Sequence, residues 1–324
     1  MTFGCDKIEK RPLHRFVTDT ALPLEINMKN GLIILNKEEG ITSQGAVNRV
    51  KRLLGVDKAG HTGTLDPLAT GVLPILVGRA VKASEFMLTA DKHYKATLLL
   101  GIETDTEDVT GVTLSESEKI PSEKEVQRAV ENMQGESMQI PPMYSAIKVG
   151  GKKLCDLARE GKMAERAPRP ITVHEIKANK ICDREYELIV KCSKGTYIRT
   201  LCADIGRALG CGGTMKTLKR LTASGFSIEE AHTLSEIEKM SESERDALII
   251  PTEKIFEDKR ALTLPPFFAR LARCGVEIYL KKIGLSLPVG EIVRLCDEGG
   301  FFAVGEVREF EAGTAIKPIR QFDI

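Results

Sequence analysis

The stretch GHTGTLDPLATG, residues 60–71, holds three glycines and one proline, and its apolar residues follow neither a helical nor a strand period. We therefore expect a loop. Asp66 stands directly before Pro67, which restricts the backbone of the aspartate to extended conformations. Because loops on a rigid scaffold often carry functional side chains, Asp66 is a candidate for chemistry. An isolated Leu-Asp-Pro is more often an ordinary turn, and a lone His61 is more often structural.

The segments on both sides of this loop mix strand and helix patterns. Thr42 and Ser43 are candidate N-caps of a helix whose apolar residues recur at helical spacing until Gly55. Ser122 and Glu125 form a capping box before another helix. Further helices are expected between 77 and 94 and from 198 to 209; the expected strands are 31–36, 72–77, 94–100, 171–173 and 186–192. Strands and helices do not alternate strictly, which favours an α+β fold over a doubly wound sheet.

The length of 324 residues exceeds the roughly 100 to 200 residues usual for one domain. After about residue 255 the pattern changes to short alternating segments, with DEGG at 297–300 as the turn of a hairpin between 291–296 and 301–307. We predict a main domain over 30–255 and a small β-rich domain over 256–324. Residues 1–29 are predicted to be a leader, either disordered or the result of a mis-assigned start, since Met28 precedes the first strand.

Several classes of protein are disfavoured by the composition. No apolar run approaches the ~20 residues that a bilayer requires, and no signal or transit sequence is recognisable, so we expect a soluble cytoplasmic protein. The eight cysteines form no C-x-x-C pair, which argues against a zinc site, and we interpret them as reduced thiols. A phosphate-binding G-x-x-x-x-G-K-[ST] motif is also absent, so nothing supports nucleotide-dependent chemistry.

Charge is segregated along a chain whose net charge is only +1. Residues 101–136 hold ten acidic and three basic residues, whereas residues 191–220 hold seven basic residues and one acidic. Residues 146–170 hold seven basic and three acidic residues. Any one such segment is as well explained by solvated surface charge. Two basic segments in a nearly neutral chain favour a localised track that binds phosphates.

Longer blocks of the sequence resemble a known family, the TruB-type pseudouridine synthases. The stretch GHTGTLDPLATGVLP (60–74) resembles the catalytic signature of that family, and its length makes chance agreement improbable. The resemblance covers roughly residues 30–226 and is weak beyond them. Further blocks follow in the order and spacing of the family: DKHYKATLLLGIETDTED (91–108), QIPPMYSAIKVGGKKLCDLAREG (139–161), CSKGTYIRTLCADIGRALGCG (192–212) and LKRLTASGF (218–226).

The resemblance implies a catalytic domain with a mixed or antiparallel sheet, and it implies roles for individual residues. Asp66 would be the nucleophile that attacks the target uridine, a reaction that needs neither metal nor cofactor. Tyr94 would stack on the flipped base and assist removal of the proton from C5. Arg199 would pair with Asp66 and keep it ionised, because a nearby positive charge lowers the pKa of a carboxylate.

The remaining site residues follow from the same resemblance. Tyr197 and Leu218 would line the base pocket, and His61 would enter the RNA where the flipped base has left. Lys37 matches a lysine that supports the active-site region structurally. The family usually has proline after this lysine, where this chain has Glu38, whose carboxylate would compete for the charge of Lys37.

Residues 139–170 resemble the RNA-gripping insertion of the stand-alone bacterial enzymes, with Lys148, Lys152 and Lys153 as phosphate contacts. The implied activity is isomerisation of the T-loop uridine at tRNA position 55. The enzyme would act as a monomer without an obligatory protein partner, and a PUA-like domain over 256–324 would touch the acceptor arm. Two alternatives stay open: a guide-RNA-dependent synthase, and a tRNA-folding chaperone or binding module. A purely binding role would not need Asp66, Tyr94 and Arg199 together.

Overall fold

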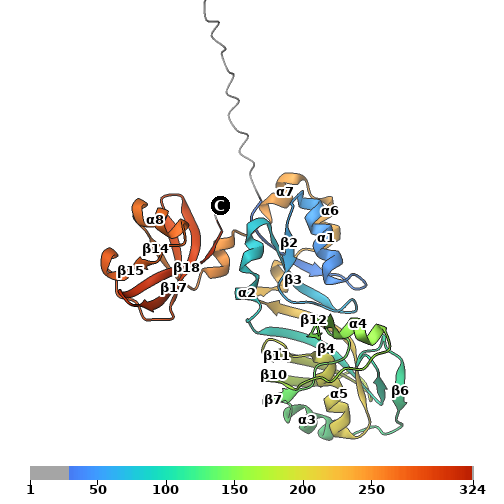
Figure 1. The fold of residues 1–324 in the computed structure, drawn as a ribbon. Helices are drawn as coiled ribbons and strands as arrows, with labels where there is room; N and C mark the ends of the chain where they lie inside the picture. The colour runs from blue at the N-terminus through green and yellow to red at the C-terminus, as the bar shows by residue number, and fades with distance from the viewer. Residues whose placement is uncertain (1–28, 323–324) are drawn as a thin grey trace, which may run out of the picture.

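The computed structural model describes residues 29–322, so the predicted leader lies outside the described residues apart from Lys29. A larger body is built on a nine-stranded sheet, and a smaller C-terminal body on a five-stranded sheet (Figure 1). Among the described residues, no helix is both long enough and apolar enough for a membrane crossing.

The main sheet runs in the order β1-β3-β12-β4-β11-β10-β7, with β2 added to β3 and β13 to β12. All of these pairs are antiparallel except β12 with β3, which confirms the predicted mixed sheet. The bounds are β1 Gly31–Lys37, β2 Ala59–His61, β3 Thr70–Val77, β4 Lys92–Leu100, β7 Gly135–Gln139, β10 Arg169–Lys180, β11 Glu185–Cys192, β12 Gly213–Ala223 and β13 Phe226–Ser227.

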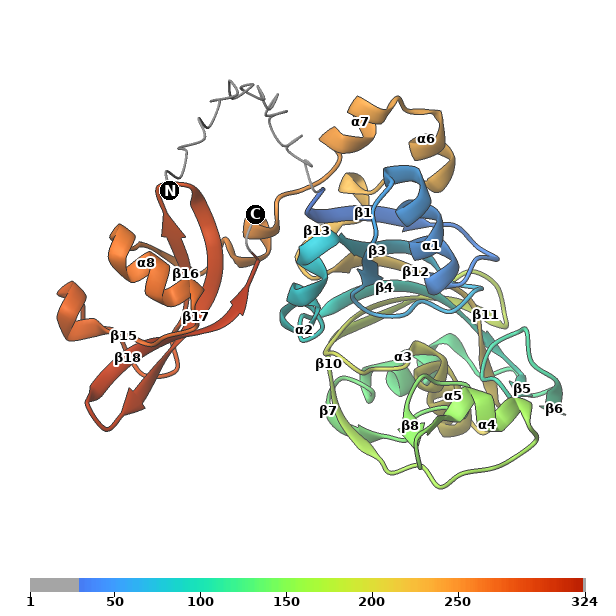
Figure 2. The ribbon, with the colours of Figure 1, turned by 45° about the horizontal axis from the view of Figure 1, so that its top comes forward.

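The longer helices pack along this sheet, and Figure 2 shows α1 beside β1 and β3 and α3 and α5 in the lower half of the larger body. Helix α1 (Ser43–Leu54) lies against β2 and β3, α5 (Ile198–Leu209) against β12 and β4, and α3 (Glu123–Glu131) against β10 and α5. The shorter elements of this body are η1 Gly78–Ala83, α2 Ser84–Met87, β5 Ile102–Thr104, β6 Thr113–Glu116, β8 Lys148–Val149, β9 Lys152–Lys153, α4 Leu154–Arg159, η2 Ile228–Glu230, α6 Leu234–Lys239, α7 Glu242–Ala247 and η3 Thr252–Phe256.

Local sequence signals confirm where these helices begin and end. The Thr42 hydroxyl accepts a hydrogen bond from the Gly45 amide and caps α1, whereas Ser43 lies inside the helix. Gly55 and Gly210 end α1 and α5 in the left-handed conformation. The capping box predicted before α3 is present with both of its hydrogen bonds. The predicted loop over 60–71 is shorter than expected, because its first two residues belong to β2 and its last two to β3.

The C-terminal body has the strand order β14-β16-β17-β18-β15, with bounds β14 Arg260–Thr263, β15 Ile278–Tyr279, β16 Ile292–Asp297, β17 Gly300–Phe310 and β18 Gly313–Gln321, and with α8 Pro266–Arg273 and η4 Leu280–Ile283 beside it. The register pairs Asp297 with Gly300, which confirms the hairpin predicted at DEGG. This part is β-rich as expected; the PUA-like assignment and the domain boundary at 255/256 stay predictions.

An aromatic cluster joins the two bodies. Phe86 of α2 packs edge to face on Phe256, with ring centroids 5.1 Å apart, and Phe256 contacts Phe301 and Phe322 of the C-terminal body. Figure 1 shows α2 on the side of the larger body that faces the orange and red strands. An ion pair between Glu85 and Arg320 reinforces this contact.

Gly71 marks the point where β3 and β12 approach each other most closely. It pairs with Arg220 in the short parallel ladder and has a φ of +102°. A Cβ atom at this position would overlap the backbone carbonyl oxygen of Arg220. The position therefore excludes any side chain, both by conformation and by space.

Replacement of this glycine should destabilise the fold far more than replacement of a glycine that only has positive φ. We expect Gly71→Ala to lower the free energy of unfolding by more than about 3 kcal/mol, since backbone atoms must move apart. Gly55→Ala is the control, because a Cβ atom there meets nothing within 4 Å; its cost should be about 1 kcal/mol. Urea unfolding measures both, and equal costs would contradict the close approach.

Candidate active site

The loop between β2 and β3 is fixed on both sides of Asp66. The Ser43 hydroxyl donates to the Leu65 carbonyl oxygen and accepts from the Leu65 amide, both at 2.8 Å. On the other side, the Lys37 ammonium group donates to the Pro67 carbonyl oxygen at 3.2 Å. Because both neighbours of Asp66 are tied to the scaffold, the position of the carboxylate is set before any ligand binds.

Lys37 is fully buried at the end of β1. Besides Pro67, its ammonium group donates to the carbonyl oxygens of Glu38 and Ile41 at 2.9 and 2.8 Å. Burial lowers the pKa of Lys37 to about 8, while the charge of Asp66 acts in the opposite direction. The Glu38 carboxylate accepts a hydrogen bond from Ser235 instead of contacting Lys37. Glu38 therefore does not compete with other groups for the charge of Lys37 in these contacts. Lys37 instead holds the backbone of the Asp66 loop at Pro67.

The guanidinium group of Arg199, in the first turn of α5, contacts the carboxylate of Asp66. Nε lies 2.9 Å from Oδ2, and Nη2 lies 3.5 Å from Oδ1. Arg199 also donates to the carbonyl oxygens of Thr106 and Tyr144 at 3.0 and 2.7 Å. Only 5% of the Arg199 side chain is exposed, compared with 34% for Asp66. The arginine is thus buried behind a carboxylate that stays open to solvent on one side.

The pKa of Asp66 differs from what the ion pair alone would predict. Partial burial of the carboxylate raises its pKa above the ordinary value, and the nearby charge of Asp108 adds to this effect. Arg199 and Lys37 oppose the shift without cancelling it. The Asp66 carboxylate therefore takes up a proton at a higher pH than an exposed aspartate, and the two cations limit this rise.

Tyr94 and Leu218 lie on neighbouring strands, and their side chains share one face of the sheet. Leu218 pairs with Ala96, two residues from Tyr94 along β4, and both side chains are buried in the same core cluster. Tyr197, the N-cap residue of α5, is half-buried; its amide donates to the Gln139 side chain and its carbonyl oxygen accepts from it.

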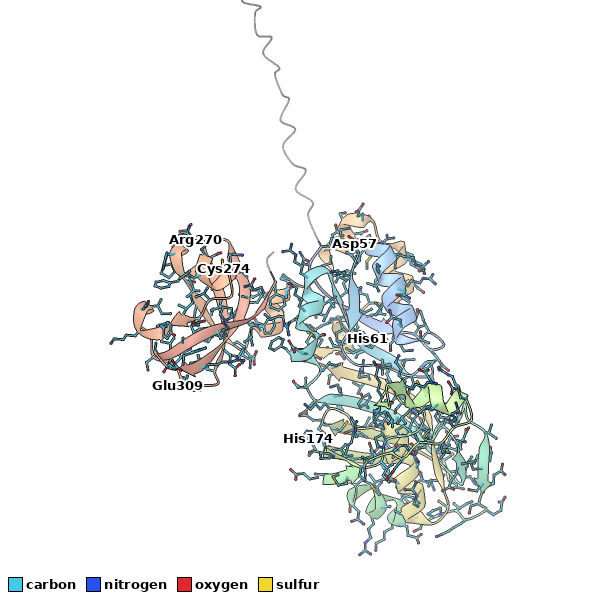
Figure 3. The ribbon with its side chains drawn as sticks, in the orientation of Figure 1. Asp57, His61, His174, Arg270, Cys274 and Glu309 are labelled. Carbon is cyan, nitrogen blue, oxygen red and sulfur yellow. The ribbon has the colours of Figure 1, made fainter. Side chains whose placement is uncertain are left out.

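His61 ends β2, a few residues before Asp66, and lies in the middle of the larger body (Figure 3). Its Nδ1 is buried and has no hydrogen-bond partner among residues 29–322. Burial lowers the pKa of His61, and the charge of Arg220 lowers it further, so the imidazole is neutral at physiological pH.

The three predicted phosphate contacts lie apart from this cluster on a short hairpin. Lys148 of β8 pairs with Lys153 of β9, and Lys148, Lys152 and Lys153 are exposed. Lys152 makes an ion pair with Glu160 at 3.5 Å. The hairpin lies in segment 139–170, as does Tyr144, whose carbonyl oxygen accepts from Arg199; this segment therefore contacts the site directly.

Two charged residues of the site were missed at the level of sequence. Asp108 is 5% exposed, accepts hydrogen bonds from the hydroxyl groups of Thr106 and Thr110, and lies 3.9 Å from Arg199. Arg220 is 1% exposed and sits on β12 opposite Tyr94. Asp108 lies in a run of acidic residues, so nothing in the sequence distinguishes it from its neighbours. Arg220 could have been found, because in a strand it shares a face with Leu218, which was already assigned to the base pocket.

Comparison with known proteins gives matches over most of the chain. Residues 51–198 match the family model described as TruB family pseudouridylate synthase (N terminal domain), and residues 199–257 match that of the tRNA pseudouridylate synthase B C-terminal domain. A relative from Methylobacillus flagellatus, named tRNA pseudouridine synthase B, is 43% identical over 86% of this chain and 91% of its own length. A protein of the same name from Francisella tularensis subsp. novicida is 39% identical over 89% and 93%.

Solved structures give the same picture of the fold. The crystal structure of a Cbf5-Nop10-Gar1 complex contains a chain that is 25% identical, with a TM-score of 0.66 over 93% of this chain and 87% of that one. An H/ACA RNP bound to a substrate RNA gives 24% identity and a TM-score of 0.67 over 93% and 88%. The sequence matches extend through the Asp66 loop, β4 and α5, and on this evidence the chain belongs to the TruB family of pseudouridylate synthases.

Proposed function

We propose that this protein is a tRNA pseudouridine synthase that isomerises the T-loop uridine at position 55, with Asp66 as the nucleophile. The observation that carries the proposal is the Asp66–Arg199 pair in a loop fixed at Leu65 and Pro67. Its context is a chain about 40% identical to proteins named tRNA pseudouridine synthase B.

The residue types suit the chemistry. The reaction breaks the bond between N1 and C1′, turns the uracil, and joins C5 to C1′; the proton lost from C5 is balanced by one gained at N1. A fixed carboxylate serves as nucleophile, and Arg199 holds it in its ionised, oriented form. Tyr94 stacks on the base after it has flipped out of the RNA, and its hydroxyl group assists removal of the C5 proton.

The surrounding side chains complete the site. Leu218 and Tyr197 line the base pocket, and His61 takes the place of the flipped base in the RNA loop. A neutral imidazole suits this role, because it stacks among bases without bringing a charge that must be desolvated. Lys37 acts through the loop that it holds and does not touch the reacting atoms.

A synthase that works within a protein–RNA particle is the second candidate, because the solved chains of similar fold come from Cbf5-Nop10-Gar1 and H/ACA RNP complexes. The higher identity to proteins named tRNA pseudouridine synthase B favours a stand-alone enzyme. The exposed lysines of the β8–β9 hairpin supply the direct grip on the T-arm that such an enzyme needs. The C-terminal body would add contacts to the acceptor arm.

Asp66→Asn should abolish product formation and leave tRNA affinity near that of the unmodified protein, because an amide keeps the size of the side chain but is a poor nucleophile. We expect the single-turnover rate to fall by more than about a thousandfold. Asp204→Asn on α5 is the matched control, since Asp204 also pairs with an arginine and is 32% exposed. A rate for Asp66→Asn within about tenfold of the unmodified protein would refute the assignment.

Replacement of Lys148, Lys152 and Lys153 by glutamine should weaken tRNA binding through loss of phosphate contacts. Each lost contact should reduce the slope of log K against log salt by about 0.7 to 0.9. The triple variant Lys124→Gln, Lys177→Gln, Lys180→Gln is the control, because these lysines are exposed on α3 and β10 outside the insertion. Filter binding across a salt series measures the slopes, and equal slopes for the two triple variants would contradict the proposed track.

The purified protein should convert an isolated T-stem-loop transcript in the presence of EDTA, with no guide RNA, partner protein or nucleotide. The stem should be one that folds in monovalent salt alone. Replacement of the target uridine by cytidine should abolish product, because the base is read on its edge. Product that forms only after a guide RNA or partner is added would support the particle-dependent enzyme. Tight binding without product under all conditions would support a tRNA-folding chaperone or binding module.

A further inference from the structure

Arg220 is among the largest side chains of the protein that are fully buried, with 1% of its surface exposed. In the described part of the chain it has no carboxylate within ion-pair distance, whereas Arg199 faces two. Burial of an unpaired guanidinium group is costly unless hydrogen bonds to it compensate. The acceptors of the Arg220 hydrogen bonds therefore indicate which part of the structure this side chain stabilises.

Both hydrogen bonds of the Arg220 side chain go to backbone carbonyl oxygens around the Asp66 loop. Nε donates to Val72 at 2.7 Å, and Nη2 donates to Gly63 at 3.1 Å. Gly63 lies three residues before Asp66, and Val72 six residues after it. One planar guanidinium group therefore binds the backbone on both sides of Asp66, at Gly63 and at Val72. Ser43 and Lys37 bind the residues next to Asp66, Leu65 and Pro67.

The same guanidinium group lies beside Tyr94. Arg220 of β12 and Tyr94 of β4 are direct partners in the antiparallel ladder, so their side chains occupy the same face of the sheet. A β-bulge follows Arg220 in this ladder, and bulges often turn a side chain toward a site. Burial raises the pKa of the Tyr94 phenol, whereas the nearby charge of Arg220 acts in the opposite direction.

The site thus contains two buried arginines with separate tasks. Arg199 contacts the carboxylate of Asp66, whereas Arg220 donates to the backbone of the Asp66 loop from a position directly opposite Tyr94 in the β4–β12 ladder. We propose that Arg220 is a positioning residue for the isomerisation, which fixes the loop of the nucleophile relative to the Tyr94 hydroxyl group that serves the C5 proton. This inference rests on the proposed function and assigns a role to a residue that does not itself touch the uridine.

Arg220→Lys tests the proposal in a protein that keeps the buried charge. A lysine ammonium group cannot reproduce the planar pair of hydrogen bonds to Val72 and Gly63, so the geometry loosens. We expect the single-turnover rate of pseudouridine formation to fall by about a hundredfold, the effect typical of a misplacement near 1 Å. The tRNA Kd should stay within about threefold, since no contact to RNA is lost. Arg220→Met should lower the rate further.

Arg245→Met is the matched control for a merely structural effect. The Arg245 guanidinium group also donates to three backbone carbonyl oxygens, those of Ile237, Leu53 and Glu238, and within residues 29–322 it makes no hydrogen bond to the Asp66 loop or to Tyr94. This variant should lower the melting temperature and leave the rate of the folded protein unchanged. If Arg220→Lys behaves in the same way, Arg220 is only a fold-stabilising residue.

Combination with Tyr94→Phe distinguishes the role further. Since Arg220 acts partly through the Tyr94 hydroxyl group, Arg220→Lys should reduce the rate by a clearly smaller factor in the Tyr94→Phe background than in the unmodified protein. Equal factors in the two backgrounds would overturn the proposal, as would an Arg220→Lys variant with full activity. An unmodified protein that is inactive on the T-stem-loop would instead count against the proposed function, so the two failures are distinguishable.

Discussion

The buried guanidinium group of Arg199 is the contact on which the site depends. It binds the Asp66 carboxylate, lies 3.9 Å from the Asp108 carboxylate, and donates to the carbonyl oxygens of Thr106 and Tyr144. The carboxylate of Asp66 and the carbonyl oxygens of Thr106 and Tyr144 come from three segments that are far apart in the sequence. A planar group with five donors satisfies them together, which lysine could not do. The Asp66 loop, the acidic segment after β5 and segment 139–170 are therefore held in one arrangement by a single side chain.

Burial and charge act against each other around Asp66. Partial burial and Asp108 raise the pKa of the carboxylate, and Arg199 and Lys37 lower it. The carboxylate is thus partly desolvated and at the same time close to two cations, which oppose its protonation. The loss of either cation would shift this balance toward the protonated, unreactive form.

The backbone around the site is fixed by three buried side chains. Ser43 holds Leu65, Lys37 holds Pro67, and Arg220 holds Gly63. All three donors are buried, so their hydrogen bonds compete little with water. Burial of the two cations costs free energy, but their hydrogen bonds hold the loop in one conformation. A reaction that depends on the placement of a carboxylate requires such a fixed loop.

The sequence alone determined that a loop lies within 60–71, where α1 and α3 are capped, the hairpin at DEGG and the family to which the chain belongs, because each of these depends on short-range patterns or on long motifs. It also named Asp66 and Arg199, which the fold brings into contact. Only the tertiary structure decided that β12 inserts between β3 and β4, since a parallel pairing between distant strands leaves no local signal. The position of β12 between β3 and β4 brings Arg220 close to Gly63, Val72 and Tyr94. The direction of the Asp66 pKa shift also depends on burial, which is a property of the folded chain and not of neighbouring residues in the sequence.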